Sequence, residues 1–210
     1  MRVPVDFRKV FQSVDFSQHE SIGACLWDRQ LYTSATTTAM LFFQTVRTAK
    51  RDGNIQIASQ LPAGIFFLCQ AIRIFPVVRP DQRAALTAGN EGQLLSVADD
   101  LAQLFNDGVL RLDILNKTYA EYPMFLLAPG AGIITNQTTF STTAQASNYA
   151  VTPTVGVPDN RSVFTLSQPI GIPPLTTIQA RLDWASALTL EAGNMNLEVI
   201  LDGQLIRPKQ

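Results

Sequence analysis

A period-two alternation of apolar and polar side chains is the feature that most constrains how this chain can fold. From Ile178 to Trp184 every second residue is apolar, and the residues between them are polar. Residues 110–114 repeat the pattern. Successive side chains of a β-strand point to opposite faces of a sheet, so both segments are predicted to be strands with one buried face. Such strands bury their apolar faces against a second sheet, which indicates an all-β sandwich.

Five further segments have the composition of strands. Residues 65–75 are apolar on both faces except at Gln70 and Arg73, which is typical of a strand in the centre of a sheet. The other expected strands are residues 41–46, 54–58, 122–127 and 163–166.

The C-terminal segment carries the clearest turn signal. Residues 197–207 are strand-like on both sides of Asp202-Gly203. Asp-Gly favours a two-residue type I′ turn, because both central positions of that turn need positive φ. The sequence therefore predicts a hairpin that places Glu198 opposite Arg207, where the two charges favour the pairing.

Two segments depart from the strand pattern. Apolar residues recur at helical spacing before Gly108, which favours the end of a helix, so we expect one inserted α-helix over about 94–107. Residues 135–161 are rich in Thr, Ser, Asn and Gln, almost uncharged, and interrupted by Pro153 and Pro158. This stretch is predicted to be a long polar loop with room for short strands of its own.

Length and composition indicate one ordered domain behind a short arm. The chain has 210 residues, of which 46% are hydrophobic and only 16% charged, so the bulk of it is expected to collapse and fold. We assign residues 1–20 to an N-terminal arm and residues 21–210 to a single domain. The longest apolar region, 63–78, is interrupted by Gln70, Arg73 and Pro76 and is not expected to span a bilayer.

Few kinds of chemistry are compatible with this composition. His19 is the only histidine, and neither it nor Cys25 and Cys69 has zinc-ligand spacing. We therefore expect no enzyme activity, no metal and no cofactor, and we expect two buried free thiols. The formal net charge of -1 argues against sequence-specific nucleic-acid binding, which needs a basic surface.

The N-terminal arm combines cations with apolar residues. Its candidate contact residues for another subunit or a membrane are Phe7, Arg8, Lys9 and Phe11. Three interpretations stay open: the arm docks on a neighbouring subunit, it packs on an edge of its own domain, or it lies as a helix in a membrane interface.

The only tight basic cluster lies ahead of Asp52-Gly53. It consists of Arg47, Lys50 and Arg51. A turn of solvated charge and a contact with a phosphate or a protein partner are both compatible with this spacing.

The layout of the strand-like segments resembles that of a known family. Residues 41–44, a charged turn, Leu61-Pro62-Ala63-Gly64 and the long strand that follows are similar to jelly-roll capsid proteins of tailless icosahedral bacteriophages, many of which enclose a lipid membrane. Residues 164–170, Pro173-Pro174 and the segments to 207 fit the second half of such a roll.

The resemblance implies a single jelly-roll β-sandwich that acts as a structural virion protein. Such a capsid subunit is made in the host cytoplasm and self-assembles into an icosahedral shell. Its implied partners are copies of itself, other virion proteins and an internal lipid membrane. The alternative is a ligand-binding or host-attachment β-sandwich module, for example glycan-binding, without catalytic activity. That alternative predicts exposed aromatic residues such as Tyr119, Tyr122 or Tyr149 along a groove.

Overall fold

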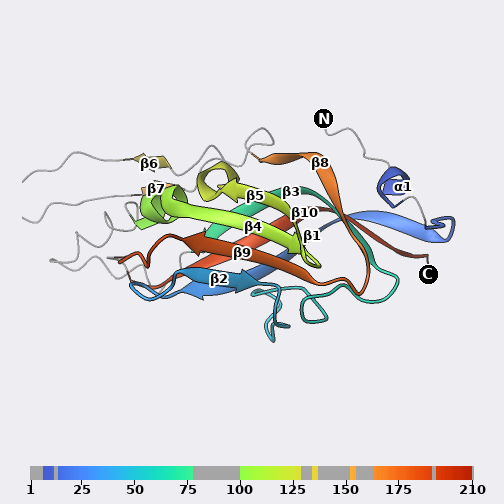
Figure 1. Ribbon diagram of the computed structural model, residues 1–210, viewed down its shortest axis with the longest axis horizontal. Helices are drawn as coiled ribbons and strands as arrows, with labels where there is room; N and C mark the ends of the chain where they lie inside the picture. Colours follow the sequence, from blue (N-terminus) through green and yellow to red (C-terminus); the bar gives the residue numbers. More distant parts are fainter. Residues whose placement is uncertain are drawn as a thin grey trace, which may run out of the picture.

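Two antiparallel sheets of four strands each face one another in the computed structural model (Figure 1). The structure describes residues 7–11, 14–77, 100–128, 134–136, 152–154, 163–190 and 193–209. Sheet A has the order β1 (His19–Tyr32), β10 (Met195–Pro208), β3 (Phe66–Val77), β8 (Thr165–Ile172). Sheet B has the order β2 (Ala39–Phe42), β9 (Ile178–Trp184), β4 (Gly108–Ile114), β5 (Lys117–Pro123). The predicted all-β sandwich is confirmed.

The core lies between the two sheets and follows the alternation in the sequence. Along β4 and β9 every second side chain is buried, which confirms the two strands predicted from their period. Leu110 and Leu182 are register partners in sheet B, and both are fully buried. Across the core, Ile72 and Leu201 of sheet A are also fully buried.

The predicted C-terminal hairpin is wrong. β10 runs for 14 residues straight through Asp202-Gly203, because it pairs with β1 on one side and β3 on the other. The register shift between Asp202 and Gly203 leaves Gln70 of β3 without a partner on β10, which is the signature of a β-bulge. A Cβ at Gly203 would collide with the carbonyl of Leu68 on β3, so this glycine serves close strand approach.

The charges that were expected to pair across the hairpin have other partners. Glu198 accepts from Arg29 of β1 at 2.6 Å, and Arg207 donates to Glu20 at 2.7 Å. Both ion pairs join β10 to β1, so they hold the register of sheet A.

Three other expected strands differ in the structure. The strand expected over 41–46 ends at Phe42, the last residue of β2. Residues 54–58 form no strand: the loop that contains them forms two isolated bridges, one between Gly53 and Asp28 of β1 and one between Ile57 and Gln60. β5 stops at Pro123, and the chain continues as a 3₁₀ helix, η2 (Met124–Leu127), because proline supplies no N–H to a sheet.

The helix and the polar loop are described only in part. Residues 100–107 are helical, as predicted, and the first half of the predicted helix lies outside the described residues. Gly108 opens β4 without a positive φ, and a Cβ there would collide with Met124, so close packing explains this glycine. Within the predicted loop, β6 (Ile134–Asn136) pairs with β7 (Thr152–Thr154) as a short ribbon. The rest of the loop, including Tyr149, lies outside the described residues.

Candidate functional site

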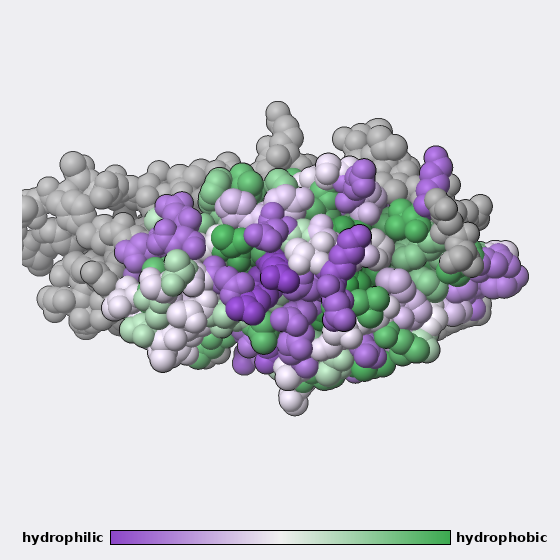
Figure 2. All heavy atoms as spheres, viewed as in Figure 1, coloured by the Kyte–Doolittle hydropathy of each residue, from purple (hydrophilic) through white to green (hydrophobic). Residues whose placement is uncertain are grey.

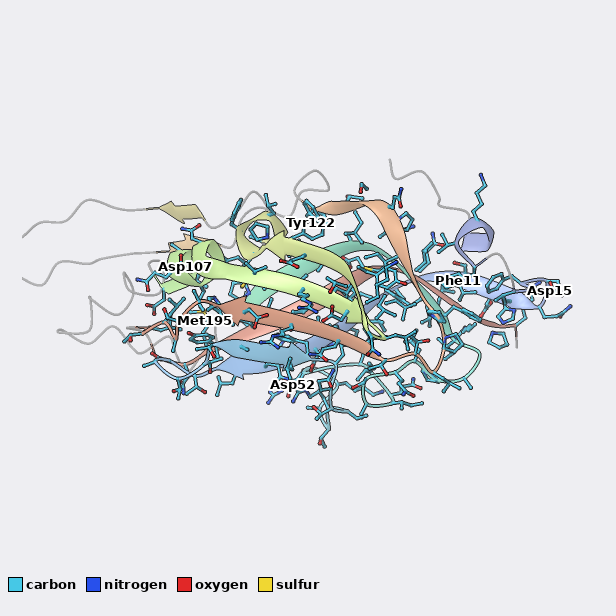
Figure 3. All side chains as sticks on the ribbon, in the orientation of Figure 1. Phe11, Asp15, Asp52, Asp107, Tyr122 and Met195 are labelled. Atoms are coloured by element: carbon cyan, nitrogen blue, oxygen red, sulfur yellow. The ribbon has the colours of Figure 1, made fainter. Side chains whose placement is uncertain are left out.

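The N-terminal arm, which includes the short helix α1 (Phe7–Val10), packs on its own chain (Figures 1 and 3). The rings of Phe11 and Phe16 each lie 5.2 Å, centroid to centroid, from Phe66 of β3 in edge-to-face contacts. Both are buried in a cluster with Ile206 that is separate from the main core. Because Ile206 alternates along β10 with Leu205, which packs against the main core, this arm cluster lies on the outer face of sheet A.

Gly171 of β8 allows the arm to pack closely on sheet A. A Cβ at Gly171 would lie 2.9 Å from the Phe11 ring, so any side chain there would displace the arm. Among the candidate contact residues, Phe11 is therefore used within the chain, and Lys9 lies at the surface. Phe7 and Arg8 belong to α1, and their side chains lie outside the described part of the structure.

The structure separates the three members of the basic cluster. Arg47 donates through Nε to Asp28 of β1 at 2.6 Å, and Asp28 is fully buried. Arg51 is 79% exposed and lies 3.6 Å from Asp52, and Lys50 is also exposed. Arg47 therefore fixes the loop to β1, whereas Lys50 and Arg51 remain available at the surface.

Asp28 also holds a strained backbone. Its Oδ2 accepts the N–H of Phe43 at 2.7 Å, and Phe43 has a φ of 67°. A bulky residue in the left-handed region costs on the order of 1–3 kcal/mol and persists only when its surroundings impose it. Here the buried carboxylate and the complete burial of the Phe43 ring impose it.

One end of the sandwich, here called the loop end, carries exposed leucines. It comprises residues 57–61, the turn at 115–116 and the turn at 173–177, which are joined by backbone hydrogen bonds. Leu115 donates to Thr177 at 2.8 Å, and Leu175 donates to Leu61 at 3.0 Å. Leu115 is 65% exposed with a φ of 56°, and Leu175 is 59% exposed with a φ of 55°. Neither leucine was predicted as a functional residue, because an isolated leucine in a turn carries no periodic signal.

The outer face of sheet B is polar (Figure 2). Arg111 and Arg181 are register partners on β4 and β9, at positions where like charges repel. Each arginine pairs with an aspartate two residues along its own strand, Asp113 at 3.0 Å and Asp183 at 2.6 Å. The neighbouring Asp113 raises the pKa of Arg111. The face is therefore charged but locally neutralised.

A cleft of about 460 Å³ opens on the side of the sandwich where β5 and β8 are the terminal strands. Tyr119 and Tyr122 of β5 line it, together with Ser167 and Gln168 of β8 and with Phe11 of the arm. Both tyrosines are among the residues predicted to lie along a groove, whereas the two β8 residues were not predicted. Figure 3 shows Tyr122 beside β8.

The reactive side chains are dispersed in the described part of the chain. Its described residues contain no group of three or more potential metal ligands. His19 packs edge-to-face on Phe16 in the arm cluster, 5.2 Å between centroids. Both cysteines are free; Cys69 is buried, as expected, whereas Cys25 is only half-buried. Burial raises the pKa of both thiols. No described helix is long and apolar enough to cross a bilayer.

Comparison with known proteins gave no match to a family model, to a curated protein or to a solved structure.

Proposed function

We propose that the sandwich is a single jelly roll and that the chain is a structural virion protein, a capsid subunit that assembles with copies of itself into an icosahedral phage shell. The order of the strands carries this proposal. With the β6–β7 ribbon set aside, the pairs β1–β10, β2–β9, β3–β8 and β4–β5 nest inside one another. Such nesting supports the proposal, because a double-sheet jelly roll winds two paired halves of a chain into two sheets, and viral capsid domains include this fold.

The loop end offers a surface suited to such assembly. The backbone of Leu115 and Leu175 joins the loops of the monomer, but their side chains leave more than half of their surface exposed, and leucine is disfavoured in left-handed backbone. A neighbouring subunit that covers the two leucines would gain about 25 cal/mol for each Å² of apolar surface buried. Closed shells repeat each contact many times, so modest individual contacts suffice.

The proposal is tested by the solution mass of the purified chain, measured by light scattering over a concentration series, with negative-stain images of any large fraction. We expect a rise with concentration toward oligomers or shells. A strict monomer of 23.0 kDa at every concentration would contradict the proposal and favour the ligand-binding alternative.

Two variants sharpen this test. The double substitution Leu115→Asn with Leu175→Asn should leave a folded monomer that assembles poorly, because asparagine tolerates positive φ and removes the apolar contact. Leu126→Asn is the matched control, since Leu126 is 43% exposed but lies in η2. If the unchanged chain, the double variant and the Leu126→Asn control assemble equally well, the loop end is not an assembly contact.

The arm is tested separately by deletion of residues 1–16. The deletion removes Phe11 and Phe16 from the outer face of sheet A and exposes Phe66. If the arm serves its own chain alone, the truncated protein loses stability but assembles normally once folded. If the arm also ties subunits together, assembly falls below that of the full chain at matched folded concentration.

A further inference from the structure

The β5–β8 cleft exists because β8 leaves the ladder of sheet A. On β3, Cys69 pairs with Ile170 and Ala71 pairs with Thr165, so residues 166–169 of β8 have no register partner on β3. This excursion lies opposite the bulged Gln70. It carries Ser167 and Gln168 into the lining of the cleft, with their backbone groups not used by the β3 ladder.

Three aromatic side chains line the cleft, and two of them are held by packing within the chain. The Tyr122 ring is held edge-to-face by Phe164 at 4.7 Å, and it packs against the main core. Phe11 is buried in the arm cluster. Tyr119 is 46% exposed, with Nζ of Lys117 lying 5.3 Å from its ring centroid. Aromatic groups fixed before a ligand arrives lose little conformational entropy on binding.

The chemistry of the lining is neutral. Among the residues that the structure describes, those that line the cleft are all uncharged. A buried charge needs a charged or strongly hydrogen-bonding partner, so the described lining favours a neutral ligand. It offers phenol, hydroxyl and amide groups beside apolar walls. Its volume falls within the range of about 300–1,000 Å³ that is typical of small-molecule sites.

We propose that this cleft binds a neutral sugar, one or two pyranose rings in size. A pyranose has an apolar face of C–H groups that packs on an aromatic ring, and hydroxyl groups around its rim. We place the apolar face against Tyr119 or Tyr122, and the hydroxyl groups on Gln168 and Ser167. The proposal does not depend on the capsid function, because the cleft is formed within a single chain.

The test is saturation-transfer NMR of the full chain with a panel of neutral probes: the methyl pyranosides of glucose, galactose, mannose and N-acetylglucosamine, and the disaccharides maltose and lactose. We expect at least one probe to bind. Tyr119→Ala and Gln168→Ala should each weaken that binding about tenfold, because each removes one stacking or hydrogen-bonding contact. Both side chains are at the surface, so both variants are expected to fold.

Matched controls separate the cleft from the rest of the surface. Phe125→Ala removes an aromatic ring that is 53% exposed on η2, and Gln18→Ala removes an exposed amide near the arm. Both should bind the probe as the unchanged chain does. Gly171→Ala should weaken binding, because its Cβ displaces the Phe11 wall.

Three results would overturn the proposal. The first is the absence of saturation transfer with every neutral probe. The second is equal binding by the cleft variants and their controls. The third is tighter binding of N-acetylneuraminic acid or of a proline-rich decapeptide in the same cleft, since either would show that the site is built for another class of ligand. The sugar test leaves the capsid proposal untouched, since that proposal depends on the solution mass.

Discussion

Arg47→Met should destabilise the folded chain strongly. Asp28 is fully buried and accepts from Arg47 Nε at 2.6 Å and Nη2 at 3.3 Å. Without Arg47 the carboxylate keeps the Phe43 N–H at 2.7 Å and Gln30 Nε2 at 3.4 Å. Breaking a buried ion pair by removing one partner costs about 3–5 kcal/mol.

Solvent reduces that cost. The Arg47 side chain is 24% exposed, so water reaches the cation and screens the pair. We therefore expect a loss of about 3 kcal/mol in the free energy of unfolding, near the lower end of the range. The assay is urea unfolding followed by the fluorescence of Trp27 and Trp184.

Two further variants make the result specific. Arg51→Met changes an arginine of the same cluster that is 79% exposed, and it should cost no more than about 0.5 kcal/mol. Asp28→Asn keeps an acceptor for the Phe43 N–H, so combining it with Arg47→Met should cost less than the two single losses added together. A loss below about 1 kcal/mol for Arg47→Met, or strict additivity in the double variant, would refute the structural role of the Arg47–Asp28 pair. Arg47 would then again be a candidate for contact with a partner.

Three other changes test separate parts of the fold. Gly203→Ala should lower the free energy of unfolding by at least about 2 kcal/mol, measured in urea, because the new Cβ collides with the β3 backbone. Gly23→Ala is the control: its Cβ meets nothing within 4 Å, so the free energy of unfolding should change by no more than about 1 kcal/mol. Equal losses in the two variants would contradict the close approach of β10 to β3 at Gly203. Leu115→Asn should raise the melting temperature of the monomer, with a gain of about 0.5–1 kcal/mol from relieved strain, and a fall would show that the leucine packs within its own chain. Burial raises the pKa of Cys69, so its neutral thiol contributes full stability below the unfolded thiol pKa of about 8.5, and that contribution falls as the pH rises above it. Cys69→Ala should flatten the alkaline loss of stability by up to about 1.4 kcal/mol per pH unit between about pH 9 and 11, measured by urea unfolding, and an unchanged slope would assign that loss to other groups.

The sequence predicted best what depends on one face of a strand. β9 and β4 were predicted from their period, because each has one buried and one solvated face, so apolar and polar residues alternate along the strand. The Asp202-Gly203 turn failed for the opposite reason. Its propensity is local, whereas the pairing of β10 with β1 and β3 is set by residues more than a hundred positions away.

The candidate sites show the same limit. The basic cluster was visible in the sequence, but its division into a structural Arg47 and a surface Arg51 depends on Asp28, which lies 19 residues before Arg47. Tyr119 and Tyr122 were predicted, for the ligand-binding alternative, to be exposed aromatic residues along a groove; Tyr119 is exposed and Tyr122 is half-buried. The cleft forms because residues 166–169 of β8 do not pair with β3, and no pattern in the sequence of these residues predicts that break in pairing.

The nested pairing of the strands also fixes when the protein can fold during its synthesis. β10 follows every other strand of the two sheets in the sequence, yet it lies between β1 and β3 in sheet A. At about 5–20 residues per second, the ribosome needs on the order of ten seconds to reach β10 after it has made β3. Throughout that interval β1 and β3 present strand edges with no partner, which are open to mispairing with other chains. The exposed edges of β1 and β3 therefore need protection until β10 has been made, and a ribosome that stalls before Met195 leaves these two strands without the strand that joins them.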